Sequence, residues 1–169
     1  MIKESKLPTG KTFESFDIKK YPLKIRQQIK NLESGDFLDR RENILVFGKP
    51  GRGKTHLLCA LAYEQIDKGR RMLFTKCSLL VQKLLKAKKD LELEKKLKKL
   101  AKYEGIIIDD IGYVGQTREE MEVLFTFLAE RYERGSVMIT SNLPFSKWDK
   151  IFKDPMTTAA AIDRLVHHS

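Results

Sequence analysis

A glycine-rich segment at residues 48–55 has the spacing G-x-x-x-x-G-K-[ST] of the phosphate-binding P-loop. Its glycines allow the backbone to curve around an anion, so that successive N–H groups point at phosphate oxygens. Lys54 can reach the β- and γ-phosphates, and the Thr55 hydroxyl can bind Mg²⁺. An apolar run before the motif and a helical run after it favour this interpretation over a glycine turn with a chance lysine. The segment predicts nucleoside triphosphate binding by Gly48, Pro50, Gly51, Arg52, Gly53, Lys54, Thr55 and His56.

Two adjacent carboxylates, Asp109 and Asp110, end a second apolar run at 105–109. This is the Walker B pattern of P-loop NTPases, in which the first carboxylate holds Mg²⁺ directly or through water. The second would lie toward the γ-phosphate, where it can orient and polarise the attacking water. A pair of aspartates that only turns the chain after a buried strand is the alternative. We therefore expect Thr55 and Asp109 as the metal ligands.

Asn142 follows another strand candidate at 136–140. If that strand lies between the P-loop strand and the Asp109 strand, the Asn142 amide can bond both a γ-phosphate oxygen and the attacking water. Taken alone, Ser-Asn before Leu-Pro is a turn signal. Its place in the series favours a sensor of the γ-phosphate.

An arginine completes the expected set, because a guanidinium near the developing charge accelerates phosphoryl transfer, often from a neighbouring subunit. Arg164 is the first candidate, and Arg131 and Arg134 are the alternatives. For each of them a structural ion pair, with Asp163 or Glu130, remains open. The predicted catalytic residues are Lys54, Asp109, Asp110, Asn142 and Arg164.

Strand and helix patterns alternate along the chain and must position these groups. Apolar strand candidates lie at 44–47, 71–75, 105–109 and 136–140. Helical patterns cover about 23–38, 54–67, 78–102 with a break, 117–133, and a final piece from about 156. This βαβα order predicts an α/β fold, with a parallel sheet and helices on both of its faces.

The formal net charge of +10 favours an acidic partner, most commonly nucleic acid. Much of the excess lies in the helical stretch 78–102, for which we expect two amphipathic helices broken near 88–90. Their inward face can be formed by Leu80, Leu84, Leu91, Leu97 and Leu100. Outward lysines would contact DNA phosphates without reading sequence, although a merely solvated lysine face is the alternative. The candidates are Lys83, Lys86, Lys88, Lys89, Lys95, Lys96, Lys98 and Lys99.

Several classes of protein are disfavoured. No apolar stretch approaches the roughly 18 residues of a membrane span, and the first residues, Met-Ile-Lys-Glu-Ser-Lys, lack the apolar core of a secretory signal. Cys59 and Cys77 have neither metal-ligand spacing nor a disulfide framework, and Cys59 is expected as a small buried thiol. These features predict a cytoplasmic protein with no membrane partner.

Several segments carry a family resemblance. They are Gly48 to Leu57, Ile-Ile-Asp-Asp-Ile-Gly-Tyr at 107–113, Glu-Arg-Tyr-Glu-Arg-Gly-Ser at 130–136, and Ile-Thr-Ser-Asn-Leu-Pro-Phe-Ser-Lys-Trp at 139–148. They resemble the IstB-like ATPases, helper proteins of IS21-type insertion sequences, which are sister to the DnaC and DnaI helicase loaders within the AAA+ class. The resemblance extends from 11–17 to 163–168, and the segment 130–148 is its most specific part.

The resemblance implies an AAA+ fold of the P-loop (ASCE) type, with ATP and Mg²⁺ as cofactors. It also implies a homo-oligomer with ATP at its subunit interfaces, binding of double-stranded DNA, and a transposase as partner. Residues 43–169 would be the AAA+ ATPase core, and residues 1–42 an N-terminal linker and helix that pack on it. By position, Asn142 matches sensor 1 and Arg164 the arginine finger, and the lysine-rich helices match an extra DNA-binding helix of initiator-type relatives.

The sequence departs from the family pattern at two points. The second Walker B carboxylate is often Glu, and Asp110 is one methylene shorter, which affects the expected hydrolysis rate more than ATP binding. Family members continue beyond Ser169 into a last strand and carry a small N-terminal domain. We therefore expect the core to lack a C-terminal part.

The leading hypothesis is a helper ATPase that assembles on duplex DNA and supports IS21-type transposition by target selection and transposase recruitment. A replicative helicase loader of the DnaC/DnaI type, which would prefer single strands, is the alternative within the class. A static scaffold with structural ATP and a small-molecule P-loop kinase are alternatives from other classes. The segment 130–148 favours the transposition helper, and the sensor Asn142 disfavours the kinase.

Overall fold

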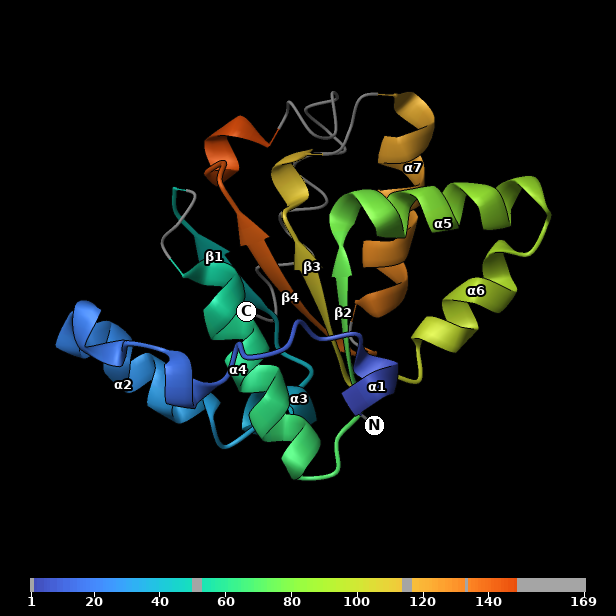
Figure 1. Ribbon diagram of the computed structural model, residues 1–169. Helices are drawn as coiled ribbons and strands as arrows, with labels where there is room; N and C mark the ends of the chain where they lie inside the picture. Colours follow the sequence, from blue (N-terminus) through green and yellow to red (C-terminus); the bar gives the residue numbers. More distant parts are fainter. Residues whose placement is uncertain (1, 50–52, 114–116, 133, 149–169) are drawn as a thin grey trace.

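The computed structural model describes residues 2–49, 53–113, 117–132 and 134–148 (Figure 1). These residues form a four-stranded parallel sheet in the order β1-β4-β3-β2. The strands are β1 (Ile44–Phe47), β2 (Met72–Lys76), β3 (Gly105–Asp109) and β4 (Ser136–Ser141). The predicted α/β fold is confirmed, and β4 lies between β1 and β3 as expected.

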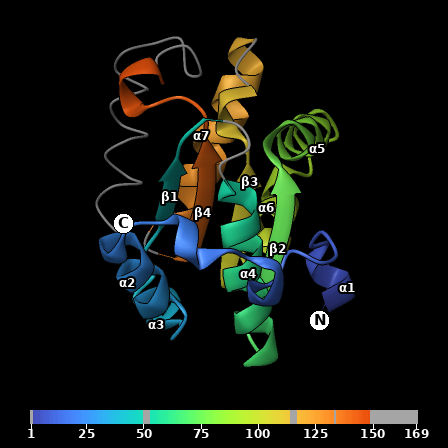
Figure 2. The ribbon, with the colours of Figure 1, turned by 60° about the vertical axis from the view of Figure 1, so that its left-hand side comes forward.

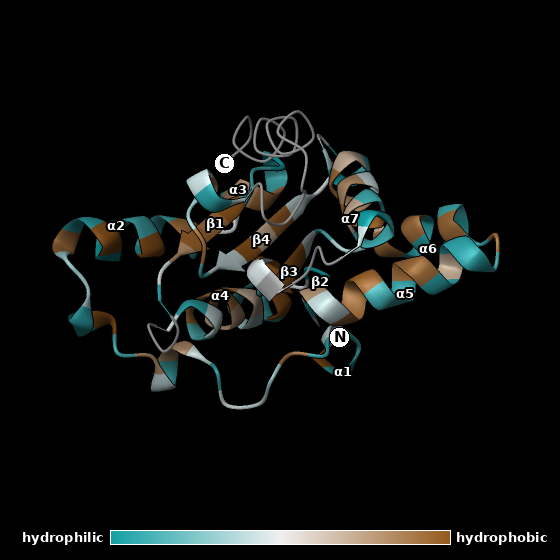
Figure 3. Cartoon of the chain, turned by 90° about the horizontal axis from the view of Figure 1, so that it is seen from above, coloured by the Kyte–Doolittle hydropathy of each residue, from teal (hydrophilic) through white to brown (hydrophobic). Residues whose placement is uncertain are grey.

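Helices cover both faces of the sheet. They are α4 (Lys54–Asp67) on one face, and α5 (Cys77–Lys89) and α7 (Arg118–Arg131) on the other. Seen from above in Figure 3, the brown hydrophobic strands lie between α4 and α7. Because successive strand side chains alternate between faces, Ile107 packs in the α4 cluster, whereas Ile106 and Ile108 pack in the cluster of α5 and α7. A strand buried on both faces explains the continuous apolar run at 106–108.

Short helices and turns make up the N-terminal segment. They are α1 (Ile2–Ser5), α2 (Leu23–Leu32), α3 (Asp36–Asp39), and the 3-10 turns η1 (Phe13–Ser15) and η2 (Ile18–Lys20). Figure 2 shows this segment crossing α4 on its way from α1 to α2. Ile29, Phe37 and Leu38 are buried in the same apolar cluster as Leu58 of α4. The segment is thus packed on the helix that follows the P-loop.

The prediction of one helix over 23–38 is wrong in its C-terminal part. The helix ends at Leu32, and Gly35 adopts a φ of 83° before α3 begins. A Cβ at Gly35 would collide with the side chain of Gln65, whose Nε2 donates a hydrogen bond to the Glu33 carbonyl at 3.0 Å. The close approach of α4 therefore requires a glycine, and the left-handed glycine ends the helix.

The lysine-rich stretch forms α5 and α6 (Leu93–Leu100), and the predicted break between two helices is confirmed. Leu80, Leu84 and Leu100 are buried, but Leu91 is 93% exposed, so its expected inward position is wrong. The Leu91 N–H donates to the Lys88 carbonyl at 3.2 Å in the turn that ends α5. Leu91 has a φ of 58° there, and this left-handed backbone turns its side chain away from the core.

Replacing Leu91 with glycine should stabilise the protein. A left-handed conformation costs an L-residue about 1–2 kcal/mol, and the greater freedom of glycine in the unfolded chain offsets part of the gain. We expect the free energy of unfolding in urea to rise by about 0.5–1 kcal/mol. Leu91→Ala keeps the Cβ and serves as the control, with no comparable gain. A loss of stability in Leu91→Gly would mean that the leucine side chain packs.

The remaining elements are α7 and the turns η3 (Ile111–Tyr113) and η4 (Phe145–Lys147). Helix α7 starts after Thr117, whose hydroxyl accepts a hydrogen bond from the Glu120 N–H at 3.2 Å, as a helix cap does. The helical piece expected from about residue 156 lies outside the described residues. In the ranges that the structure describes, no helix is long and apolar enough to cross a membrane.

Candidate active site

The predicted site residues meet at the carboxyl ends of three neighbouring parallel strands. Gly48 follows β1, Asp109 ends β3 and Asn142 follows β4, while Lys54 begins α4. The Gly48 N–H donates to the carbonyl of Ser141 at 3.1 Å, which ties the start of the P-loop to the end of β4. Ligands of open α/β sheets bind outside the carboxyl ends of strands, so this edge is the expected location of a binding site. Pro50, Gly51 and Arg52 lie outside the described residues.

Lys54 is held at the centre of this edge. Its side chain is buried, and its Nζ donates to the carbonyls of Gly48 at 2.7 Å and Lys49 at 2.9 Å and to Asn142 Oδ1 at 2.8 Å. Three neutral oxygens orient the ammonium without cancelling its charge. The positive charge therefore remains for an anion, and the bond to Asn142 joins the P-loop to the strand that carries the predicted sensor.

Asp109 accepts two hydroxyl hydrogen bonds on one oxygen. Thr55 Oγ1 and Thr140 Oγ1 each donate to Asp109 Oδ1 at 2.7 Å. The set offers oxygen donors only, which fits Mg²⁺, a hard cation that usually keeps several waters beside one or two protein ligands. Within the described residues, no group of three or more His, Cys, Asp or Glu side chains forms a denser metal cluster.

The positioning contact of Thr140 was not predicted. In the sequence this contact is indicated by a hydroxyl residue near the end of the apolar run of β4. The partner of that hydroxyl is more than thirty residues away in the sequence. Packing of β4 directly beside β3 brings the two together. A polar β-branched residue inside a fully buried strand is the feature that would have pointed to it.

Asp110 lies beside Asp109 but has a different environment. Its Oδ1 accepts the N–H of Gly112 at 3.1 Å and the N–H of Asn142 at 3.4 Å. These bonds orient the carboxylate from the ends of two adjacent strands. Asp110 therefore also stabilises the local turn, in addition to any part it takes in chemistry.

The two cysteines near the site are not candidates for a nucleophile. Burial raises the pKa of the Cys59 thiol to about 12, with a further contribution from Asp109. Burial also raises the pKa of Cys77, and the charges of Asp110 and Asp109 act in the same direction. Since the thiolate is the reactive form, both residues remain neutral thiols at physiological pH.

The prediction of Arg131 as an alternative arginine finger is wrong. Its side chain is buried, and its guanidinium donates to the backbone carbonyls of Ser136 at 2.7 Å and Tyr103 at 2.9 Å. Burial lowers its pKa to about 10. Arg131 therefore fastens α7 to the ends of neighbouring segments, and it cannot reach a second subunit.

The other two arginine candidates are not placed at the site. Arg134 forms an exposed ion pair with Glu130 at 2.8 Å, which was the structural alternative for this residue. Arg164, the first candidate, lies outside the described residues. The arginine finger therefore remains a prediction.

An aromatic-walled cavity of about 360 Å³ borders the P-loop at Gly53. Phe16 stacks on Tyr21 with ring centroids 5.6 Å apart and meets the ring of His56 edge-on at 5.3 Å. His56 Nε2 lies 3.0 Å from Ser15 Oγ. Thus His56, predicted to bind the nucleotide, faces the N-terminal segment. The aromatic residues of this segment were a sequence signal, but their position beside Gly53 depends on a contact across more than thirty residues.

The structure divides the predicted DNA-binding lysines into two groups. Lys83 and Lys96 are partly buried and line a cavity beside β2, so the expectation that all the lysines point outward is wrong for these two. Lys99 is exposed at the same cavity. The others are exposed on α5, its C-terminal turn and α6: Lys86, Lys88, Lys89, Lys95 and Lys98. Of these, Lys88 lies 3.6 Å from a carboxylate oxygen of Glu122.

The strand order, the P-loop after β1 and the acidic end of β3 define a P-loop domain of the AAA+ class. Solved structures share this fold at 18% sequence identity. DnaI matches with a TM-score of 0.76 over 94% of this chain and 87% of its own, and the DnaC helicase loader with 0.71 over 90% and 93%. AMPPCP-bound DnaA from Aquifex aeolicus matches with 0.75 over 92% of this chain and 48% of its own.

The chain belongs to the IstB-like ATP binding protein family, whose family model matches residues 1–169. It is 46% identical to a protein of Sinorhizobium fredii over 99% of the chain and 57% of that protein. It is 40% identical to an IS21 protein of Pseudomonas aeruginosa over 99% of the chain and 63% of that protein. Both are named as insertion sequence ATP-binding proteins. The chain thus spans about three fifths of the length of these relatives.

Proposed function

We propose that this chain binds ATP with Mg²⁺, hydrolyses it, and uses the nucleotide state to control assembly on duplex DNA in support of IS21-type transposition. The observation that carries the nucleotide part is the buried Lys54, oriented by two P-loop carbonyls and Asn142 without a carboxylate partner among the described residues. Family membership supports the insertion-sequence context. Target selection, transposase recruitment and a homo-oligomer with ATP between subunits are parts of the same proposal.

The residues have separate tasks in the proposed reaction. Lys54 exchanges its carbonyl contacts for oxygens of the β- and γ-phosphates, and the N-terminus of α4 adds favourable dipoles. Thr55 and Asp109 would hold Mg²⁺, which when bound neutralises charge between these phosphates. Asp110 orients the attacking water and accepts its proton, the water oxygen bonds to the γ-phosphorus as the bond to the β–γ bridging oxygen breaks, and ADP leaves with that oxygen. Asn142 contacts the transferred phosphate and signals its presence to β4.

The cavity beside Gly53 would take the adenine base. It borders the P-loop, and its walls include the flat rings of Phe16 and Tyr21. Gly53 has a φ of 78°, and a Cβ there would lie 2.8 Å from the Tyr21 hydroxyl, so a glycine allows the P-loop to approach the side chain of Tyr21 closely. In this arrangement the N-terminal segment would sense whether a nucleotide is bound.

Removing the Phe16 ring should weaken ATP binding about tenfold, because stacking of a base on an aromatic ring is worth about 1–3 kcal/mol. Calorimetric titration of Phe16→Ala with ATP and with inorganic tripolyphosphate separates base binding from phosphate binding. The affinity for tripolyphosphate should not change. Phe13→Ala is the matched control, since Phe13 touches Phe16 but does not line the cavity. Equal losses for both ligands would place the base elsewhere.

The duplex DNA part of the proposal rests on the outer lysines, which we define as Lys86, Lys89, Lys95 and Lys98. All four are exposed, and no described carboxylate lies within ion-pair distance of any of them. Changing all four to glutamine should weaken duplex binding. It should also reduce the steepness with which the logarithm of the binding constant falls with the logarithm of salt concentration, by about 0.9 for each lost phosphate contact. The control variant has four exposed N-terminal lysines changed to glutamine, which removes the same net charge: Lys3, Lys19, Lys24 and Lys30.

Binding of the parent protein to duplex and single-stranded oligonucleotides decides between the two candidate functions. The fold of DnaI and DnaC supports the helicase-loader alternative, whereas the family assignment supports the transposition helper. We expect tighter binding to the duplex. Preference for the single strand would favour the helicase loader. If the outer-lysine variant had the same salt dependence of duplex binding as the parent, the DNA would bind to another surface.

A further inference from the structure

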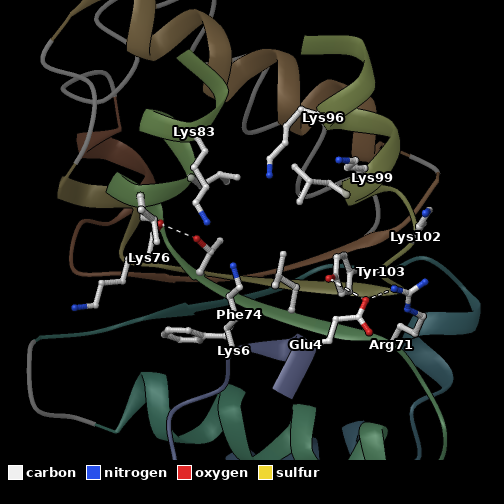
Figure 4. Close-up of a pocket in the computed structure, with 15 residues that line it drawn as sticks. Glu4, Lys6, Arg71, Phe74, Lys76, Lys83, Lys96, Lys99, Lys102 and Tyr103 are labelled. Atoms are coloured by element: carbon white, nitrogen blue, oxygen red, sulfur yellow. Dashed lines mark hydrogen bonds and ion pairs between the residues drawn. The ribbon is translucent and has the colours of Figure 1, made fainter. Parts of the chain in front are cut away.

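A second cavity, of about 480 Å³, lies at the edge of the sheet beside β2. It is bounded by β2, the helices α5 and α6, and the N-terminal segment at α1 (Figure 4). Lys6, Lys83 and Lys96 reach it from three of these elements, and Figure 4 shows their ammonium groups directed into the same space. Three cations thus converge on a hollow that is distinct from the P-loop.

Among the residues that the structure describes, no carboxylate at this cavity is free to neutralise these lysines. Among the described lining residues, Glu4 is the one acidic side chain. It is ion-paired with Arg71 and accepts a hydrogen bond from the Tyr103 hydroxyl at 3.2 Å. The hydrogen bond from Arg71 is the main reason that the pKa of Glu4 is lowered. Glu4 is therefore engaged at the far side of the cavity.

The ammonium groups of these lysines also lie apart from the carboxylates of the other described residues. In the part of the chain that the structure describes, no carboxylate lies within 4.0 Å of the ammonium groups of Lys6, Lys83 or Lys96. Burial lowers the pKa of Lys83, and the proximity of Lys6 and Lys96 lowers it further. Like charges that converge in a partly desolvated space repel one another, and a bound anion would remove this repulsion.

The floor of the cavity is apolar. Leu80 and Leu100 are buried there, and Leu79 is 47% exposed on the same lining. An anion attached to a carbon skeleton could therefore place its charge among the lysines and its apolar part against the leucines. Both possible rings are already covered, since Phe74 is buried and Arg71 stacks 5.2 Å from the centre of the Tyr103 ring. The described lining of the cavity therefore offers no free aromatic ring on which a base could stack.

We propose that this cavity is a second anion site, which holds a phosphoryl group between Lys6, Lys83 and Lys96 with its carbon attachment against Leu79. Three ammonium donors from different directions suit the non-bridging oxygens of a phosphoryl group, which carries one negative charge in a phosphodiester and up to two in a monoester. The phosphoryl group comes either from a free phosphate compound or from a nucleic-acid backbone. The free-phosphate form is independent of the proposed function, whereas the backbone form rests on its DNA part.

Residue-specific acylation measured by mass spectrometry tests this site. It is performed in the Lys54→Ala background, so that phosphate at the P-loop does not contribute. Inorganic pyrophosphate is one probe, and a short DNA duplex is the other. A bound anion favours the charged amine of Lys83, so its acylation should slow by about tenfold for each unit by which its pKa rises. Lys96, which lines the same cavity, should also be protected by contact with the anion. Lys30, exposed on α2, is the internal control and should react at an unchanged rate in pyrophosphate.

The pattern of protection identifies the source of the phosphoryl group. Protection by pyrophosphate supports a free phosphate compound, and protection by the duplex alone supports the nucleic-acid backbone. Protection by neither probe would overturn the proposal. Failure of the duplex to bind anywhere removes the DNA part of the proposed function and leaves the pyrophosphate result unaffected.

Thermal unfolding of Lys83→Met in the same background gives a second, independent readout. Methionine keeps the length of the side chain and removes one of the converging charges. Without added anion, the melting temperature of this variant should exceed that of the Lys54→Ala protein. Pyrophosphate should raise the melting temperature of the Lys54→Ala protein but not that of the variant. Lys30→Met, at an exposed lysine of α2, is the matched control and should retain that rise. A Lys83→Met protein that is still stabilised by pyrophosphate as strongly as the parent would contradict the site.

Discussion

We expect Lys54→Ala to abolish retention of labelled ATP. The ammonium makes charge-assisted hydrogen bonds, each worth about 1.5–3 kcal/mol, and two of them to phosphate oxygens correspond to a loss of affinity on the order of a hundredfold or more. Lys54 Nζ donates to Gly48 O and to Asn142 Oδ1, so it lies at the edge of the sheet where the phosphate oxygens would bind. Filter retention or calorimetric titration with ATP and Mg²⁺ measures the effect.

Lys49→Ala is the matched control for this variant. Lys49 belongs to the same loop, but its side chain is exposed, and its described contact with Lys54 uses the backbone carbonyl. We expect ATP affinity within about twofold of the parent, because exposed charges contribute little. Undiminished ATP retention in Lys54→Ala would remove the P-loop assignment, and equal losses in both variants would indicate a general disturbance of the loop.

We expect Asp110→Asn to retain ATP but to lose turnover. The amide is close in shape to the carboxylate and keeps an oxygen for the N–H groups of Gly112 and Asn142, so the local turn should survive. It lacks the charge that polarises the attacking water, and such groups contribute about 10²–10⁴ to rate. Release of inorganic phosphate under saturating ATP measures the loss.

Asp110→Glu is the companion variant, since it keeps the carboxylate on a side chain that is one methylene longer. We expect its turnover within about tenfold of the parent, because the charge is preserved although its position moves by one methylene. Turnover of Asp110→Asn at the parent rate would reduce Asp110 to a residue that shapes the turn. A parent without turnover would instead favour the static scaffold.

The elements with strong local signals could be predicted from the sequence. The apolar run that ends at Asp109 gave the buried strand β3, and the glycine-lysine pattern gave the start of α4. The position of β4 between β1 and β3 followed from the expected chemistry of Asn142, and the sheet order confirms it. These features depend on periodicity and on motif spacing, which are local properties.

Features that depend on contacts distant in sequence could not be predicted. Arg131 looked like a free arginine on a helix, but the segments around Tyr103 and Ser136 surround it with carbonyls. Leu91 had the spacing of a core leucine, and only the backbone turn after α5 directs it into solvent. The converging lysines had helical spacing typical of a solvated face, and the N-terminal Lys6 joins them only in the folded chain.

The most direct test of the central claim is the particle mass on duplex DNA in the presence of ATP, AMPPCP or ADP. A site that controls assembly through the γ-phosphate distinguishes triphosphates from diphosphate. We predict large particles on DNA with ATP and with AMPPCP, and dissociation with ADP. Particles of the same mass with all three nucleotides would contradict the claim that this site controls assembly.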